Sequence, residues 1–371
     1  MHLNYGIIGC GMMGREHLRN IALIEHATVI GIVEPDDSMA SKAMQIAPTA
    51  ERYSSIESLL ENPDLNCLVI VSPNYCHVEQ LKLVQELRPL PILVEKPLFT
   101  SPDDLAKLES FIASYTEPVW VAMEYRYMPP IALLREKVNE LTGGIKLLTI
   151  REHRFPFLQK VKDWNRFNAQ SGGTLVEKCC HFFDLMRLLL KSEPIRIYAS
   201  GNQSINHVNE VYDGKQSDIW DNAYVTIDFA NGSKAMLELC MFAEGSRYQE
   251  EISAVGHVGK IETRIPGPGR FWPPELGDPP IAEVVVSPRN PRGPRLIQVP
   301  VDPVLLEAGD HNGSTFYQHQ YFAEVCRGMR SAPEVTLNDG MIAVLMGQAA
   351  QYSARTGLPV NWPPTPDQLS T

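Results

Sequence analysis

The sequence lacks the features that would place a protein in a membrane or in an oxidising compartment. No apolar run approaches the length that spans a bilayer. The basic and long apolar segments of a signal peptide are missing, and a strand-like run already begins at Leu3. The seven cysteines form no CxxC pair, and their odd number fits reduced thiols. We therefore expect a cytoplasmic protein without a membrane partner.

Positive charge is also scarce, since 33 Lys and Arg stand against 44 Asp and Glu and give a formal net charge of -11. An acidic surface argues against nucleic acid as the main partner, although one locally basic site could still hold a phosphorylated ligand. The length of 371 residues exceeds one typical core and suits two domains.

A glycine-rich turn near the N-terminus is the most informative motif. The apolar run Leu3 to Ile8 predicts a buried strand, and residues 15–24 predict the helix that follows the turn. A strand, G-x-G-x-x-G and a helix in this order form the dinucleotide fingerprint, in which the helix N-terminus faces the phosphates. The alternative is a turn that binds nothing. The predicted cofactor contacts are Gly9, Cys10, Gly11, Met12, Met13 and Gly14.

An acidic residue follows the next strand at the spacing that the fingerprint requires. The apolar run Thr28 to Val33 ends at Glu34, whose carboxylate can accept hydrogen bonds from both hydroxyls of an adenosine ribose. Residues 35–38 contain no Arg or Lys that could offset a 2′-phosphate. We therefore predict NAD as the cofactor, with NADP possible.

Strands alternate with helices through residue 124, which predicts a doubly wound parallel sheet. Further strands are expected at Leu65–Val71, Pro91–Val94 and Val119–Met123. Ligands of such sheets sit beyond the C-terminal ends of the strands. The residues expected along that edge, beside the glycine turn, are Glu34, Ser72, Pro73, Asn74, His77, Glu95, Lys96 and Glu124.

From residue 125 strands follow strands, which predicts an antiparallel sheet. The runs are Leu147–Phe155, Ile195–Ala199, Ala223–Phe229, Ala235–Met241, Glu251–Val255 and Ile261–Ile265. Eleven of the 29 prolines fall within residues 266–303, so we expect an irregular segment with at most short edge strands. It could be a lid, an oligomer contact or a surface excursion. We predict two domains, residues 1–124 for the cofactor and residues 125–371 for substrate binding and oligomerisation.

Two positions could carry acid–base chemistry. Lys96 follows a buried strand and precedes Pro97, so its amine could bind a substrate oxygen at a pKa lowered by burial. Glu177, His181 and Asp184 share one face if they lie on one helix, and the carboxylates would then set the tautomer and raise the pKa of the imidazole. A surface lysine and a structural histidine are the alternatives. Lys178 could bind an anionic group, but a solvated position is favoured slightly.

Together, Gly9-x-Gly11-x-x-Gly14, Glu95-Lys96-Pro97 and the glycine pair before His181-x-x-Asp184 resemble the glucose–fructose oxidoreductase, inositol dehydrogenase and MocA family. The resemblance covers nearly the whole chain. It implies an α/β protein with an N-terminal Rossmann domain and a C-terminal α+β domain that has an open, mostly antiparallel sheet. It also implies Lys96 and His181 as catalytic residues. Glu177 departs from the Asp that is frequent in the family, which puts the substrate in doubt.

The leading hypothesis is an NAD(P)-dependent oxidoreductase that acts on a hydroxyl-bearing carbon of a sugar, polyol or related small molecule. One alternative is a nicotinamide-binding regulator without turnover, and another is a family member with a tightly bound, recycling cofactor. The predicted catalytic residues are Lys96, His181 and Glu177, and no metal is expected. We also expect a homo-oligomer, a dimer or a tetramer.

Overall fold

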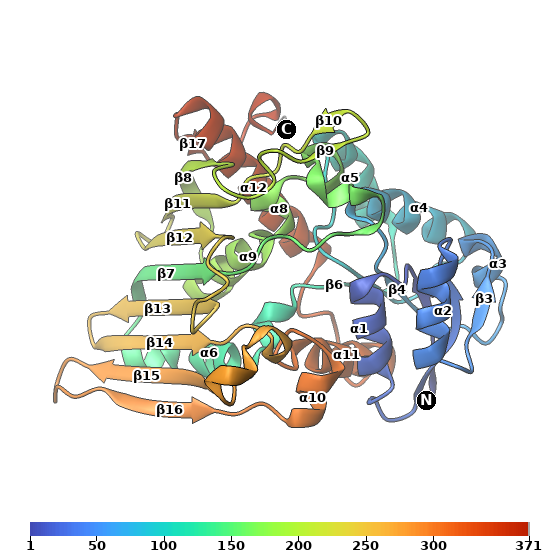
Figure 1. Cartoon of the computed structure of the whole chain (residues 1–371), viewed down its shortest axis with the longest axis horizontal. Coiled ribbons are helices and arrows are strands. Elements are labelled where there is room, and N and C mark those ends of the chain that lie inside the picture. Colours follow the sequence, from blue (N-terminus) through green and yellow to red (C-terminus); the bar gives the residue numbers. More distant parts are fainter. Residues whose placement is uncertain (370–371) are drawn as a thin grey trace.

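The computed structural model describes residues 1–369, so the last two residues of the second predicted domain lie outside it. Two sheets stand side by side (Figure 1). The first contains β1 (Leu3–Ile8), β2 (Ala27–Val33), β3 (Glu51–Tyr53), β4 (Cys67–Ile70), β5 (Ile92–Val94) and β6 (Val119–Val121). Its helices are α1 (Met12–Ile21), α2 (Asp37–Ile46), α3 (Ile56–Leu60), α4 (His77–Leu87) and α5 (Leu105–Ser114).

All neighbours in the first sheet are parallel, in the order β3-β2-β1-β4-β5-β6. The order reverses between β1 and β4, and ligands of doubly wound sheets bind in the crevice outside such a switch point. The predicted parallel sheet is confirmed. The sequence did not reveal β3, because three residues are too few to show a period.

The second sheet runs β16-β15-β14-β13-β7-β12-β11-β8-β17, and β12–β7 is its parallel pair. Its strands are β7 (Ile145–His153), β8 (Pro194–Asn202), β11 (Asn222–Phe229), β12 (Lys234–Cys240), β13 (Glu250–Gly256), β14 (Gly259–Ile265), β15 (Ala282–Pro288), β16 (Arg295–Val299) and β17 (Val360–Asn361). A separate hairpin joins β9 (Val211–Tyr212) to β10 (Lys215–Gln216). The predicted mostly antiparallel sheet is confirmed.

Helices cover one face of this sheet and leave the other open. The helices of this half are α6 (Pro129–Thr142), α7 (Asn168–Ser171), α8 (Thr174–Glu177), α9 (Cys180–Leu190), α10 (Pro303–Ala308), α11 (Ser314–Cys326) and α12 (Leu337–Thr356). Of these, α6, α9 and α12 pack against the sheet. Along β11, Ala223, Val225 and Ile227 are buried, whereas Tyr224 and Thr226 are exposed. The strand therefore has one core face and one solvent face.

The proline-rich segment is more regular than we predicted. Its prolines leave residues 281–287 free, and these form most of β15, which pairs with both β14 and β16. The expectation of at most short edge strands was wrong for β15. The physical reason is that a strand needs only a short run of residues with N–H donors. Counting prolines over the whole of residues 266–303 overlooks such a proline-free run.

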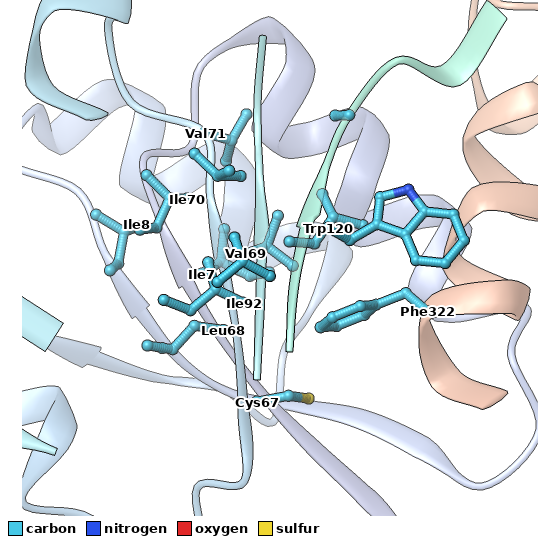
Figure 2. Close-up of a cluster of buried hydrophobic side chains, with 14 of the residues drawn as sticks. Ile7, Ile8, Cys67, Leu68, Val69, Ile70, Val71, Ile92, Trp120 and Phe322 are labelled. Atoms are coloured by element: carbon cyan, nitrogen blue, oxygen red, sulfur yellow. The ribbon is translucent and has the colours of Figure 1, made fainter. Parts of the chain in front are cut away.

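The C-terminal part of the chain returns to the first sheet. In Figure 2, Phe322 of α11 lies beside Trp120 of β6, among side chains of β1, β4 and β5. The N–H of Val121 donates to the carbonyl of Val335 at 3.2 Å. The first core is therefore built from both ends of the chain.

Within residues 1–369, no helix combines the length and the apolar character needed to cross a bilayer. The cytoplasmic location stays a prediction.

Candidate active site

The glycine turn is shaped by close backbone approaches at two of its three glycines. Gly9 has φ +96°, and a Cβ there would lie 2.8 Å from the backbone of Ser72. A Cβ on Gly14 would lie 2.4 Å from the carbonyl oxygen of Gly9, so this glycine lets α1 approach β1. A Cβ on Gly11 would meet nothing within 4 Å. The first and third glycines thus serve packing, and the second leaves open space above the turn.

The helix that begins at this turn has no local partner for its N-terminus. Gly11 is the N-cap residue of α1, so no side chain caps the helix, and its first turn contains no acidic residue. Met12 and Met13 line a cleft between the two sheets. Free N–H groups and the positive end of the helix dipole therefore face an open space, which fits the pyrophosphate of a dinucleotide.

Glu34 lies at the end of β2, where the fingerprint requires an acid. Its two carboxylate oxygens accept the N–H groups of Cys10 at 2.7 Å and Asp36 at 2.9 Å. Arg52 of β3 donates to the carbonyl oxygen of Glu34 and to the carboxylate of Asp37, both at 2.8 Å. The sequence argument missed this guanidinium because it reaches Glu34 from an unpredicted strand. The glycine turn, and the carboxylate of Glu34 at the end of β2, fit the binding of NAD.

The loop after β4 is tied to other segments. Asn74 donates to the carbonyl of Ser171 at 3.1 Å, and Ser72 donates to Gln80 at 2.6 Å. His77 is fully buried, with its ring nitrogens 2.8 Å from the Pro97 carbonyl and 3.1 Å from the Ser72 carbonyl. We therefore correct the expectation for His77. Its ring joins two loops and has no surface left for a cofactor.

Lys96 reaches the cleft from the end of β5. Its ammonium donates to the carbonyl of Glu177 at 3.2 Å. Burial alone would lower its pKa, but the nearby Cys180 thiol and the carboxylates of Glu95, Glu177 and Glu124 outweigh burial and raise the pKa. The expected lowering of the pKa of Lys96 was therefore wrong. The fold brings carboxylates that are far apart in the sequence together at this edge of the sheet.

His181 lines the same cleft, with its ring stacked on Tyr125 at 4.2 Å between centroids. Burial is the main cause that holds its pKa well below the usual range, and the charges of Lys96, Lys178, His311 and Arg154 add to it. The ring is therefore neutral at neutral pH and can accept a proton. Among residues 1–369, its buried Nδ1 has no hydrogen-bond partner.

The carboxylates predicted to flank His181 have other partners. The helix is interrupted between α8 and α9, so Glu177 and His181 do not lie on one continuous helix. Glu177 lies 3.3 Å from Lys160, and Asp184 forms a buried bidentate pair with Arg126 at 2.5 and 2.6 Å. The predicted shared face and the raised pKa of the histidine were therefore wrong.

Lys178 is buried rather than solvated, with 5% of its surface exposed. Its ammonium lies 2.9 Å from Glu152 and donates to the Tyr125 hydroxyl at 2.5 Å. Burial lowers its pKa, although Glu152 opposes this effect. Our slight preference for a solvated position was wrong, because the break before α9 turns this residue inward. Its charge is matched by Glu152 and forms part of the cleft wall.

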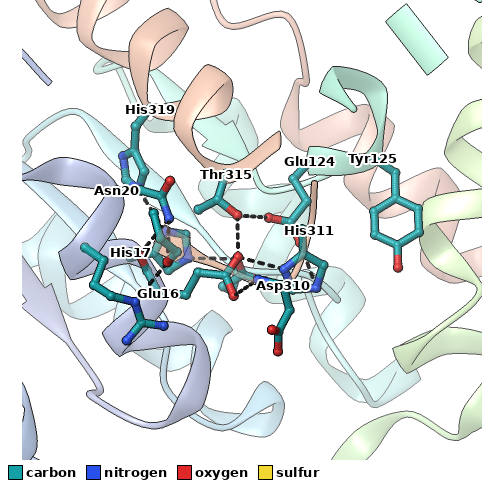
Figure 3. Close-up of polar contacts among 12 residues, drawn as sticks. Glu16, His17, Asn20, Glu124, Tyr125, Asp310, His311, Thr315 and His319 are labelled. Carbon is teal, nitrogen blue, oxygen red and sulfur yellow. Dashed lines mark hydrogen bonds and ion pairs between the residues drawn. The ribbon is translucent and has the colours of Figure 1, made fainter. Parts of the chain in front are cut away.

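A polar cluster that the sequence did not reveal borders the cleft (Figure 3). His311 Nδ1 lies 2.8 Å from Glu16, and Thr315 Oγ1 lies 2.9 Å from Glu16 and 2.8 Å from Glu124. The Thr315 hydroxyl carries one hydrogen, so it can donate to only one of the two carboxylates at a time, and burial raises the pKa of Glu124. Glu16 lies in α1, Glu124 just after β6, His311 in the segment before α11 and Thr315 in the first turn of α11, and no local pattern connects them.

Three of these residues, Glu16, Glu124 and His311, also hold ligand atoms within 4.8 Å of one another, as a metal site would. Each of the two carboxylates already accepts a hydrogen bond, Glu16 from His311 and Thr315, and Glu124 from Thr315. The expected absence of a metal stays a prediction.

The arrangement brings a neutral imidazole, a charged ammonium and the free N-terminus of α1 to one cleft between two sheets. A neutral imidazole can take a proton from a hydroxyl, and an ammonium can stabilise the oxygen that loses it. This chemistry suits hydride transfer from a hydroxyl-bearing carbon.

Both halves of the chain match descriptions of one protein family, GFO_IDH_MocA. Residues 3–123 match "Oxidoreductase family, NAD-binding Rossmann fold", and residues 135–362 match "Oxidoreductase family, C-terminal alpha/beta domain". The matches together cover most of the chain.

Similar proteins agree with this assignment. An uncharacterized oxidoreductase, YrbE, of Bacillus subtilis is 26% identical over 96% of this chain and 95% of its own length. A myo-inositol 2-dehydrogenase of Thermotoga maritima is 22% identical over 95% of this chain and 96% of its own. A levoglucosan dehydrogenase solved with NADH and levoglucosan shares the fold, with a TM-score of 0.78, 22% identity and coverage of 98% of this chain and 100% of the other.

Proposed function

The chain belongs to the GFO_IDH_MocA oxidoreductase family and has its NAD-binding Rossmann fold, and from this premise we propose that it oxidises a CH–OH group. The substrate class we propose is a sugar, a polyol or a related small hydroxy compound. The names of the inositol and levoglucosan dehydrogenases support this class. We also propose that residues 1–124 bind the cofactor and residues 125–371 bind the substrate.

His181 and Lys96 are the proposed catalytic pair. NAD supplies the acceptor for the hydride. As the hydride leaves, the hydroxyl must lose its proton, and we assign the neutral imidazole of His181, which lines the cleft, to accept it. Lys96 donates a hydrogen bond to the same oxygen and stabilises its developing negative charge. Glu177 supports the site by accepting from Lys160 and by presenting its carbonyl to Lys96.

One observation carries this proposal. Lys96, His181 and the first residues of α1 line the same cleft, although they come from a strand end, a helix of the other half and the glycine turn. A protein that only sensed nicotinamide would not need a neutral base and a charged ammonium in the cleft beside the glycine turn. Turnover therefore accounts for these residues better than binding alone.

Absorbance at 340 nm tests the proposal. The purified protein is incubated with NAD and a panel of polyols, sugars and hydroxy acids, and at least one polyol or sugar is expected to produce NADH. His181→Ala and Lys96→Ala should each lower kcat by about 100-fold or more. Their effects should be less than additive, because both act on one oxygen. Lys42→Ala, at an exposed position of α2, is the matched control and should keep full activity.

Two outcomes would contradict the proposal. If the protein binds NAD but oxidises no compound of the panel, a regulator without turnover becomes the better interpretation. If both variants remain fully active on a true substrate, the catalytic pair is wrong.

We further propose a homo-oligomer, a dimer or a tetramer, because the open face of the second sheet exposes Leu147, Tyr198 and Tyr224. Light scattering at micromolar concentration is expected to give a multiple of 41.5 kDa. A monomeric mass would contradict this expectation.

A further inference from the structure

A chain of three buried side chains lies behind the strand end that carries Lys96. His17 of α1 places Nε2 2.9 Å from Glu95 Oε1, and its Nδ1 lies 2.8 Å from Nε2 of His319 in α11. Both rings have no exposed surface, and 4% of Glu95 is exposed. Figure 3 shows the two histidines side by side, beyond the cluster around Glu16. None of the three residues lines the cleft.

The contacts define where the protons lie. An ionised carboxylate only accepts, so the N–H at Nε2 of His17 points at Glu95. A neutral His17 then has its lone pair on Nδ1, which accepts the N–H at Nε2 of His319. Only the lone pair on Nδ1 of His319 remains without a partner, and an unpaired acceptor costs less than an unpaired N–H. Both N–H groups of the chain therefore point toward Glu95.

These three hydrogen-bonded side chains keep the buried carboxylate of Glu95 ionised. Burial raises the pKa of Glu95, but the hydrogen bond from His17 and the charge of Lys96 more than compensate and lower it. The second oxygen of Glu95 accepts the backbone N–H of Lys96 at 3.2 Å. Glu95 thus acts on Lys96 in two ways, because it accepts the backbone N–H and because its negative charge helps to raise the pKa of the ammonium.

We propose that Glu95, held by the buried pair His17 and His319, is the positioning residue that keeps Lys96 charged and in place at the cleft. The three residues act through Lys96 and do not touch the substrate. The inference rests on the proposed function only in assigning a purpose to Lys96. The contact of Glu95 with Lys96 does not depend on which substrate is used.

Other groups around Lys96 set the background against which this effect is measured. The titratable groups that face it are Glu95 just after β5, Glu124 just after β6, Glu177 from α8, Cys180 and His181 from α9, and Lys160 from the loop before α7. The groups that face the histidine chain are Tyr5 of β1, with its ring 6.0 Å from that of His319, and His77 of α4, whose charge acts on Glu95. Each variant below changes only His17 or Glu95 and keeps the other groups, so a change in the titration of Lys96 can be assigned to the altered residue.

Trace acetylation measures the proton affinity of Lys96 without a substrate. The full-length protein is treated with a trace of acetic anhydride between pH 7 and pH 11.5, and acetylation of Lys96 is quantified by mass spectrometry. Lys42, exposed on α2, is the internal reference in every sample. In the wild type, Lys96 should titrate above 10.5. In His17→Phe, which leaves Glu95 without its donor, the midpoint should fall by about one unit, a tenfold rise in reactivity near pH 9.

Two further variants separate an electrostatic role from a packing role. His17→Gln keeps an N–H that can reach Glu95 and should recover at least half of the lost shift. Glu95→Gln keeps the side-chain volume and removes the charge, so it should lower the titration midpoint of Lys96 as His17→Phe does. It serves as the deciding variant if His17→Phe does not fold. The proposal is overturned if the midpoint of Lys96 in folded Glu95→Gln stays within about 0.3 unit of wild type. It is also overturned if His17→Gln and folded His17→Phe lower the midpoint equally.

The experiment also distinguishes failure of this inference from failure of the proposed function. If the midpoint shifts as expected but no hydroxy compound is oxidised, the chain of contacts sets the charge of Lys96 and the assigned reaction is wrong. If polyol oxidation is found but the midpoint does not move, the reaction stands and the positioning role fails.

Discussion

Replacing His311 by glutamine should remove a pH-dependent part of the stability. His311 donates to Glu16, and its Nε2 lies 3.7 Å from Glu124. Burial alone would lower the pKa of His311, but the charges of Glu124 and Glu16 raise it to about 9 from the usual 6.5. The side chain is 23% exposed, so water screens the interaction only in part.

The sign of the effect follows from the direction of the shift. A raised pKa means that the folded protein holds the proton more tightly than the unfolded chain. The stabilisation is therefore fully present below pH 6.5 and is lost as the pH rises through about 9. Each pKa unit corresponds to about 1.4 kcal/mol, so the rise amounts to roughly 3 kcal/mol. The pKa of Glu16, lowered to about 2, reflects the same contact and adds nothing to this figure.

Urea unfolding at pH 6 and at pH 10 measures the effect. His311→Gln should lower the unfolding free energy relative to wild type. This loss should be about 3 kcal/mol larger at pH 6 than at pH 10. His153→Gln is the matched control, because it removes a histidine that lies 3.0 Å from Glu238 on the open sheet, and it should cost less than about 1 kcal/mol. An equal loss for His311→Gln at both pH values would refute a protonated His311 between the carboxylates.

Three further predictions concern the cofactor site and the core. Gly14→Ala should weaken NAD binding by about tenfold or more in a fluorescence titration, because a methyl group 2.4 Å from the Gly9 carbonyl moves α1; unchanged affinity would contradict the close packing described. Asp184→Ala should cost about 3–5 kcal/mol in urea unfolding, because it leaves Arg126 buried and unpaired, and a loss below 1 kcal/mol would show that the pair matters little. NAD should be favoured over NADP by about tenfold in kcat/KM, because the carboxylate of Glu34 repels a 2′-phosphate and the guanidinium of Arg52 is already paired with Asp37, and a measured preference for NADP would refute this reasoning.

Local patterns predict most of the fold. The glycine turn, the acid after β2 and the alternation of strands and helices are local signals, and they gave the first sheet. Alternation of apolar and polar residues gave the antiparallel strands of the second. β3 was missed because it is too short to show a period, and β15 because flanking prolines masked it.

The sequence predicted the location of a site residue only where that residue directly follows a strand or begins a helix. Lys96 and His181 line one cleft for that reason. The charges around them were not predictable, because Lys178 turns inward at a helix break and His311 arrives from a distant segment. The pKa directions of Lys96 and His181 were reversed for the same reason, since each depends on neighbours brought together only by the tertiary fold.

The position of Phe322 has a consequence for the order in which the protein is made. The side chain completes the core of the first sheet, yet about 200 residues separate it from the end of β6. At ~5–20 residues per second, a ribosome needs roughly 10–40 s to synthesise that interval. During this time the surface of Trp120 that α11 later covers remains open on the nascent chain. The strands of the first sheet are therefore synthesised early, but α11 covers their core late. Chaperones that bind exposed aromatic surface can bind the nascent chain during this interval.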